Sequence, residues 1–227
     1  MTFKGLIFDL DNTFYSYKDR HKESLEEVFK YCKKEFGLEE THLLECFQKA
    51  RKEIHKNLKF TASSHNRLLY FQRMLEILKL NSMKYGLTLY NIYWNTFLEN
   101  LAPFLNVKSC LNNFKDRKIC ILTDLTSHIQ YRKILKLGLE RYVDYVVTSE
   151  ETGVDKPDKK MFMTALKKME LLPNEVCMVG DNFEKDIMGG NECGIFGFWF
   201  NPDQENASQE GAYISVSSFD ELQGHLK

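Results

Sequence analysis

Residues Gly5–Thr13 (GLIFDLDNT) form a short apolar run that ends in two aspartates, Asp9 and Asp11. A continuous apolar run of this length is typical of a strand that is buried on both faces of a parallel sheet. Acidic residues at its end would project from the carboxyl edge of that sheet. Because two carboxylates this close raise each other's pKa, the pattern favours a hard divalent cation beside them.

Further apolar runs follow along the chain and are separated by stretches with helical spacing. They are Ile119–Thr123, Tyr145–Thr148, Val176–Gly180 and Ile195–Trp199, and a last strand is expected near Tyr213–Val216 after a loop at Asn201–Gly211. Strands that alternate with helices predict an α/β fold, with a Rossmann-like parallel-sheet core.

Between the first two strands the pattern changes to helices alone. Leu25, Val28, Phe29 and Cys32 follow the spacing of one helix face, and Gly37 suits the end of that helix. We therefore expect two domains. Residues 1–15 and 93–227 would form the α/β core, and residues 16–92 would form an inserted α-helical cap domain.

The composition excludes some partners. Lys and Arg number 31 against 32 for Asp and Glu, and a net charge of -1 provides no overall field to attract a nucleic acid polymer. The sequence shows neither a secretory signal pattern nor an apolar run long enough for a membrane span, so a cytoplasmic protein is expected. The six cysteines are widely separated, which is typical of reduced, buried thiols.

Three more strand ends carry residues whose side chains could take part in catalysis or ligand binding. Asp181 and Asp186 follow the strand at Val176–Gly180, Thr123 and Asp124 close another, and Lys156 precedes a proline near the start of a helix. Each feature alone is common in turns and caps. Together they place carboxylates, a hydroxyl and a lysine at one sheet edge, where ligands of open α/β sheets bind.

In this order the residues resemble the four motifs of the haloacid dehalogenase superfamily, and the resemblance covers essentially the whole chain. It implies that Asp9 attacks phosphorus and forms an aspartyl-phosphate. Asp11 would be the general acid and base, and Lys156 would neutralise charge on Asp9 and the phosphate. The implied ligands of Mg²⁺ are Asp9, Asp11 through its carbonyl, and Asp181.

The resemblance also implies a phosphate site made by Thr123, Lys156 and the backbone N–H groups of Leu10 and Asp124. Asp186 would orient Lys156 or metal-bound water, and Thr13 could fix the direction of Asp9 or Asp11. One departure concerns Asp124-Leu125, where many members carry Asn-Gly.

The predicted activity is hydrolysis of a small phosphate monoester, either a nucleoside monophosphate or a sugar phosphate. Arg67, His65 and Tyr15 are the expected substrate contacts of the cap, and Arg67 would suit a carboxylate or second phosphate. A phosphomutase and a non-catalytic binding module are the alternatives. Dehalogenation is disfavoured because Asp11 supplies an acid that a departing halide does not need. The sequence leaves the oligomeric state open.

Overall fold

The computed structural model describes residues 2–203 and 211–227, so most of the expected loop at 201–211 lies outside the described residues. The chain divides into two compact units. One consists of Met1–Ser16 and Ala102–Lys227, and the other of Tyr17–Leu101. The expected fold class, a parallel-sheet core with helices around it, is confirmed.

The α/β unit is built on a six-stranded sheet in the order β3-β2-β1-β4-β5-β6, and each neighbouring pair is parallel. Its strands are β1 (Gly5–Phe8), β2 (Lys118–Thr123), β3 (Tyr145–Thr148), β4 (Val176–Gly180), β5 (Phe196–Phe200) and β6 (Tyr213–Val216). The chain adds strands on one side of β1 and then on the other, which makes the β1–β4 junction the switch point of the sheet.

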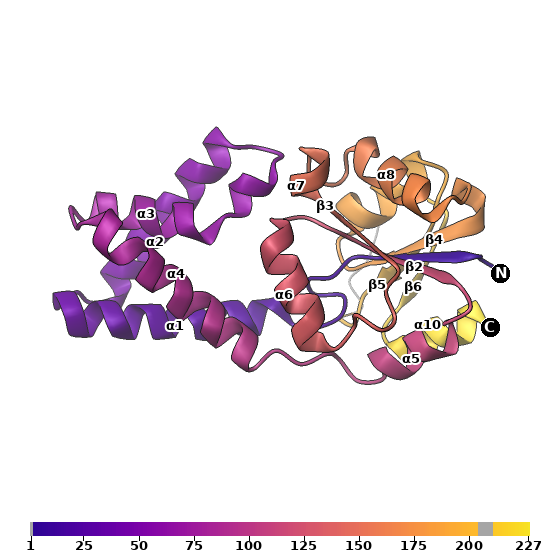
Figure 1. Cartoon of the computed structure of the whole chain (residues 1–227), viewed down its shortest axis with the longest axis horizontal. Helices are drawn as coiled ribbons and strands as arrows, with labels where there is room; N and C mark the ends of the chain where they lie inside the picture. The colour runs from indigo at the N-terminus through magenta and orange to yellow at the C-terminus, as the bar shows by residue number, and fades with distance from the viewer. Residues whose placement is uncertain (1, 204–210) are drawn as a thin grey trace. The chain divides into compact units, whose positions relative to one another are not determined.

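Helices lie on both faces of this sheet. Figure 1 shows α8 on one face and α5 with α10 on the other. The helical segments are α5 (Val107–Asn113), α6 (Ser127–Leu137), α7 (Ser149–Thr152), α8 (Lys159–Met169), η2 (Pro173–Glu175), η3 (Phe183–Met188), α9 (Gly189–Glu192) and α10 (Phe219–Leu226). Because the sheet is covered on both sides, every residue of β1 and β4 is buried.

The core explains the cysteine pattern. Cys120 packs in the same buried cluster as Ile7, Val147 and Phe162. All six cysteines are free thiols, and only Cys193 is not fully buried. Burial raises the pKa of the Cys120 thiol to about 12, as expected for an unreactive side chain.

The helical unit contains α1 (Tyr17–Phe36), α2 (Glu40–Asn57), η1 (Ala62–His65), α3 (Arg67–Ile77) and α4 (Ser82–Glu99). Helix α1 ends as expected, with Gly37 at a φ of 69°. The boundary expected after residue 92 falls inside α4. That helix continues because Tyr93, Trp94 and Phe97 extend its buried face, and the unit ends at Leu101.

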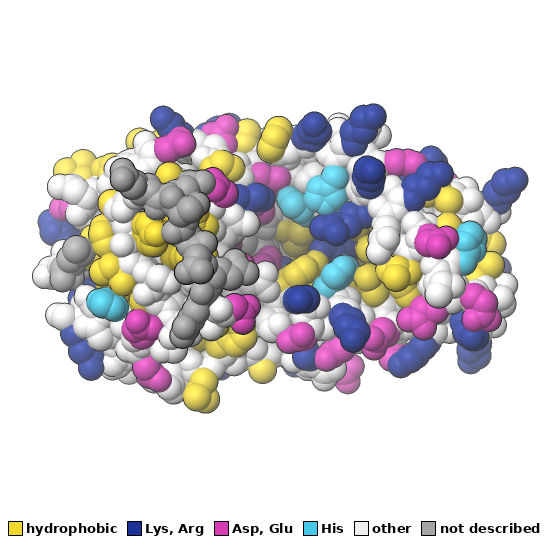
Figure 2. Space-filling model, turned by 180° about the vertical axis from the view of Figure 1, so that it is seen from behind, with side chains coloured by type: hydrophobic (Ala, Val, Ile, Leu, Met, Phe, Trp, Pro, Cys, Tyr) yellow, Lys and Arg dark blue, Asp and Glu magenta, His cyan; other side chains and the backbone are white. Residues whose placement is uncertain are grey.

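Basic and acidic side chains are interspersed on the face shown in Figure 2, in keeping with the formal net charge of -1. Within residues 2–203 and 211–227, no helix combines the length and the apolar character that crossing a bilayer requires.

Candidate active site

A small polar pocket lies at the carboxyl ends of β1, β2 and β4 and has a volume of about 160 Å³. It is lined by Asp9, Asp11, Asn12, Thr123, Asp124, Lys156, Asp181, Asn182, Lys185 and Asp186. The fold therefore brings all the residues expected from the strand ends to one place.

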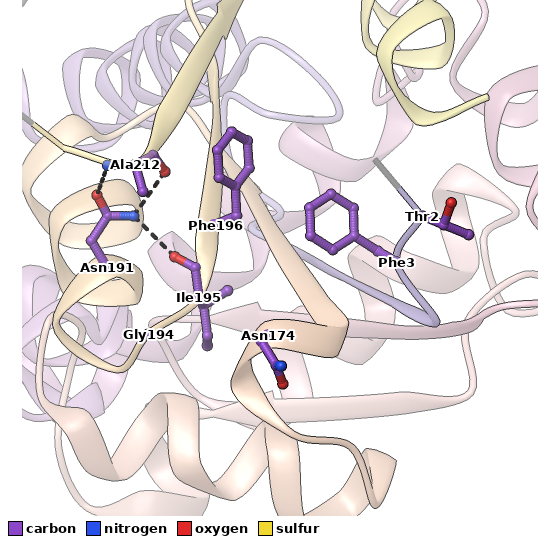
Figure 3. Close-up of a pocket in the computed structure, with 8 residues that line it drawn as sticks. All are labelled: Thr2, Phe3, Asn174, Asn191, Gly194, Ile195, Phe196 and Ala212. Carbon is purple, nitrogen blue, oxygen red and sulfur yellow. Dashed lines mark hydrogen bonds between the residues drawn. The ribbon is translucent and has the colours of Figure 1, made fainter.

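A larger pocket of about 480 Å³ lies at the opposite, amino ends of the strands. Figure 3 shows its lining, in which Phe3 stacks on Phe196 with ring centroids 5.9 Å apart. The Asn191 side chain donates to the carbonyls of Ile195 and Ala212 at 2.9 and 3.1 Å, so it ties loop backbone together. The residues that line this pocket include no charged side chain, so it is not the candidate active site.

Asp9 is buried directly after β1, and its backbone N–H donates to the Val179 carbonyl of β4 at 2.8 Å. Oδ1 of its carboxylate lies 2.6 Å from Lys156 Nζ, and Oδ2 accepts a hydrogen bond from Thr13 Oγ1 at 3.3 Å. Burial holds the pKa of Asp9 well above its usual value; Lys156 opposes this effect, while Asp186 and the other nearby carboxylates add to it.

Lys156 joins two acids, because its Nζ also lies 2.7 Å from Asp186 Oδ1. Burial alone would lower the pKa of Lys156, but Asp186 and Asp9 outweigh it and hold that pKa well above the ordinary value. The other Asp186 oxygen accepts from the Asn182 backbone N–H at 3.0 Å. Lys156 is thus a fixed cation between the two carboxylates.

Asp9, Asp181 and Asp186 each have a carboxylate oxygen that lies within 4.8 Å of those of the other two. Burial is the main cause that raises the pKa of Asp181 to about 7, and Asp186 adds to the shift. Two backbone contacts fix Asp181: its N–H donates to Thr13 Oγ1 at 3.1 Å, and its carbonyl accepts from Trp199 Nε1 at 2.9 Å. A group of buried, mutually repelling carboxylates is a donor set that suits a divalent cation.

The Asp11 side chain is not part of that acidic group. Its Oδ1 lies 2.7 Å from Lys133 Nζ and accepts from the Tyr15 hydroxyl, and its Oδ2 accepts from Gln130 Nε2 at 3.1 Å. Burial would raise the pKa of Asp11, but Lys133, Tyr15 and Gln130 outweigh it, so the pKa lies below its usual value. Tyr15, expected as a cap contact, belongs to the α/β unit and is 1% exposed.

The loop after β2 differs from a simple phosphate cradle. Thr123 Oγ1 accepts from Gln130 Nε2 at 2.5 Å, and Asp124 accepts from both the Lys156 backbone N–H and Lys185 Nζ. Leu125 has a φ of 101°, a conformation that favours glycine, and its N–H donates to Ser149 Oγ at 2.8 Å. The Leu125 N–H is therefore engaged within the protein.

Arg67 and His65 belong to the helical unit. The Arg67 guanidinium lies within 6 Å of four aromatic ring centroids, those of Tyr17, Tyr70, Tyr93 and Trp94. It donates to the Tyr17 hydroxyl, the Tyr93 hydroxyl and the His65 carbonyl. Among the described residues no carboxylate pairs with Arg67, so a buried cation stands there without a protein counter-ion.

The family model for haloacid dehalogenase-like hydrolases matches residues 6–199, which include every strand-end residue of the pocket. The chain belongs to the haloacid dehalogenase-like hydrolase family. This confirms the membership expected from the four motifs.

Similar proteins of this hydrolase family include named phosphatases. The ribulose-1,5-bisphosphate 5-phosphatase of Halopiger xanaduensis is 37% identical over 214 residues, which are 92% of this chain and 89% of that protein. A glyceraldehyde 3-phosphate phosphatase of Methanopyrus kandleri is 29% identical over 195 residues, 85% of this chain and 81% of that protein. The crystal structure of a 2-haloacid dehalogenase from Pseudomonas syringae pv. Tomato has a TM-score of 0.78 at 19% identity, covering 99% of this chain and 98% of that one, and this likeness concerns the fold.

Three residues whose side chains bind carboxylates of this hydrolase's site were missed in the sequence: Gln130, Lys133 and Lys185. Lys133 carried a signal, because it occupies an apolar-face position in the helical spacing of Ile129, Ile134 and Leu137. A lysine on the buried face of a helix is rare unless its ammonium group pairs with an acidic side chain. Gln130 and Lys185 carried no comparable signal.

Proposed function

We propose that this hydrolase is a metal-dependent phosphatase that cleaves a small phosphorylated sugar and uses Asp9 as its nucleophile. The observation that carries the proposal is the Asp9 carboxylate itself, which is buried at a sheet edge with Lys156 Nζ 2.6 Å from one oxygen. A carboxylate reacts poorly with a dianionic phosphate unless cations offset the repulsion between them. The pocket supplies one such cation in Lys156 and a donor set for a second.

Asp9 and Asp181 would hold the second cation with their carboxylates and Asp11 with its backbone carbonyl. Oxygen donors with space for water and a phosphate oxygen fit Mg²⁺. When bound, the metal ion would neutralise charge that develops on the transferring phosphoryl group. Asp186 lies beside Asp9 and Asp181 and already pairs with Lys156. It would therefore orient Lys156 or water bound to the metal ion.

The residues divide the reaction between them. Asp9 attacks phosphorus, and the leaving oxygen takes a proton from Asp11. Thr123 and the N–H groups of Leu10 and Asp124 bind the phosphoryl oxygens with Lys156. Water then attacks the aspartyl-phosphate as Asp11 accepts its proton, and Asp9 is regenerated.

The similar proteins favour a phosphorylated sugar as substrate over a nucleotide, because two relatives that cover 92% and 85% of this chain are named for sugar phosphates. Their names also favour transfer of the phosphoryl group to water over a mutase reaction. Within the helical unit, proposed as the cap, Arg67 is the candidate for a second anionic group on the substrate. Its buried guanidinium has no carboxylate partner among the described residues.

Phosphate release is the test. The purified protein would be incubated with Mg²⁺ and ribulose 1,5-bisphosphate, glyceraldehyde 3-phosphate, nucleoside monophosphates or 4-nitrophenyl phosphate. The Asp9→Asn variant should lose at least about 1,000-fold in kcat, because it lacks the nucleophile. The matched control Asp116→Asn, at an exposed turn of the same unit, should keep native activity. Equal release by the native protein and Asp9→Asn would refute the nucleophile assignment.

A further inference from the structure

Asp11 is held by residues of α6, an element the proposed reaction otherwise does not use. Lys133 Nζ lies 2.7 Å from Asp11 Oδ1, and the Lys133 side chain is 0% exposed while that of Asp11 is 26% exposed. A buried ammonium is costly unless paired, so this cation is matched to Asp11. The Tyr15 hydroxyl donates to the same Asp11 oxygen.

Gln130 lies one helical turn before Lys133 on the same face of α6. Its Nε2 lies 3.1 Å from Asp11 Oδ2, 2.5 Å from Thr123 Oγ1 and 2.8 Å from the Asp124 carbonyl. The amide thus links the proton-transfer residue with the phosphate loop. Helix α6 presents an amide and an ammonium to the two oxygens of one carboxylate.

The two buried lysines of the site pair with different carboxylates. Lys156 binds Asp9 and Asp186, whereas Lys133 binds Asp11. This arrangement separates the cation that assists the nucleophile from the cation that holds the acid.

We propose that Lys133 is a positioning residue that, with Gln130, fixes the Asp11 carboxyl in the direction needed for proton transfer to the leaving group. The inference rests on the proposed phosphatase function. Oδ1 is engaged by Lys133 and Tyr15, whereas Oδ2 has only the longer contact with Gln130 among the described residues. Oδ2 is therefore the oxygen that exchanges the proton.

In the first half-reaction the proton passes from Oδ2 to the leaving oxygen as the bond between that oxygen and phosphorus breaks and the bond from Asp9 to phosphorus forms. In the second half-reaction Oδ2 takes a proton from water as the water oxygen bonds to phosphorus and the bond to Asp9 breaks. Asp11 therefore begins and ends each cycle with a proton on Oδ2, while Oδ1 accepts from Lys133 and Tyr15 throughout. A misdirected Oδ2 would slow both steps.

The test uses leaving groups of different basicity. An alkoxide needs a proton to depart, whereas 4-nitrophenolate leaves readily without one, so an orientation defect at Asp11 should affect alkyl esters selectively. We expect Lys133→Met to lower kcat/KM for an alkyl ester such as glycerol 3-phosphate about 10- to 100-fold, and that for 4-nitrophenyl phosphate less than about 3-fold. The parameter kcat/KM is chosen because it reports steps up to leaving-group departure, while hydrolysis of the intermediate is common to both esters.

Two comparisons separate positioning from a general loss of structure. Lys136→Met removes an exposed lysine of the same helix and should leave both esters unaffected. In an Asp11→Asn background, Lys133→Met should lower kcat/KM little further, because the carboxyl group that Lys133 positions is already absent. If Lys133→Met does not fold, Tyr15→Phe can be tested instead, because it removes the other hydrogen bond to Asp11 Oδ1. It should lower kcat/KM selectively for the alkyl ester, by a smaller factor than Lys133→Met.

Equal losses on the two esters, or full additivity with Asp11→Asn, would overturn the positioning role while leaving the phosphatase function intact. Failure of the native protein to hydrolyse either ester would overturn the proposed function, and this inference with it.

Discussion

Gly180 leaves the space that the Asp186 carboxylate occupies. A Cβ at position 180 would lie 2.3 Å from Asp186 Oδ2 and 2.6 Å from Asp186 Cβ, distances that no real structure tolerates. Because Asp186 Cβ is among the obstructed atoms, rotation of the carboxylate alone cannot relieve the clash, and the backbone of η3 must shift. The glycine that ends β4 therefore sets the position of the acid that holds Lys156.

Gly180→Ala should consequently displace Asp186 and loosen Lys156. A shift near 1 Å in a catalytic group costs about 100-fold in rate, so we expect a loss of that order in kcat/KM. The control is Gly86→Ala in α4, where the nearest atom to an added Cβ is 3.8 Å away. That variant should keep its activity, and native activity in Gly180→Ala would show that η3 adapts without cost.

Binding of Mg²⁺ should weaken as the pH falls. The pKa of Asp181 is raised to about 7, chiefly by burial, so below that pH a proton occupies a group that the metal ion needs in its charged form. Isothermal titration calorimetry at pH 8 and pH 6 should show tighter binding at pH 8, with proton release at the lower pH. Asp181→Asn should weaken binding at pH 8 and reduce the pH dependence. Equal affinities of the native protein at both pH values would contradict the proposed ligand set.

His21 should make the protein less stable in mild acid. Burial first, then Arg67 and Arg51, lower the pKa of its imidazole to about 3, while in the unfolded chain the pKa is about 6.5. Between these values the unfolded state binds the proton and the folded state does not, so stability is complete above pH 6.5 and falls as the pH decreases. From pH 7 to pH 5 this residue should account for about 2 kcal/mol of lost unfolding free energy.

Urea unfolding of the native protein and of His21→Gln at the two pH values checks this expectation. The variant also loses the 2.7 Å contact between His21 Nδ1 and the Tyr93 hydroxyl, so the informative quantity is the change with pH, which should be smaller in the variant. His128→Gln, at an exposed position of α6, should follow the native protein. An identical pH response in His21→Gln and the native protein would refute the assignment.

Arg67→Lys should discriminate between substrates with one and with two anionic groups. The guanidinium binds an oxyanion through two parallel donors, which an ammonium cannot reproduce. We expect KM for a sugar bisphosphate to rise about 10-fold, while KM for 4-nitrophenyl phosphate stays near its native value. A parallel change for both substrates would indicate that Arg67 only supports the packing of Tyr17, Tyr70 and Tyr93.

The sequence predicted the strands and the residues at their ends well, because both depend on local patterns. A buried parallel strand reads as an apolar run, and Asp9 and Asp181 each follow one directly, while Thr123 ends one. The partners of those residues depend on the rotation of α6 about its axis, which no local pattern encodes. Thus the Asp11 side chain was expected to transfer protons, but its pairing with Lys133, more than a hundred positions away in the chain, was not predicted.

Two other differences have physical causes of the same kind. The buried face of α4 continues through Trp94 to Phe97, so a boundary placed at the change of pattern near residue 92 was too early. Leu125 adopts a backbone conformation that its residue type disfavours, and the Ser149 hydroxyl that holds it comes from a different strand-to-helix junction. Neither the compensating bond nor the conformation could be predicted from Asp124-Leu125 alone.

The strand order also determines when this site can form during synthesis. Strand β1 is made first but pairs only with β2 and β4, which begin at Lys118 and Val176. Contacts of such large sequence separation form late, since a long chain must close before they contribute. On the ribosome, Asp9 therefore emerges long before Lys156, Asp181 and Asp186 exist, and a chain that stops short of β4 carries the proposed nucleophile without a complete site around it.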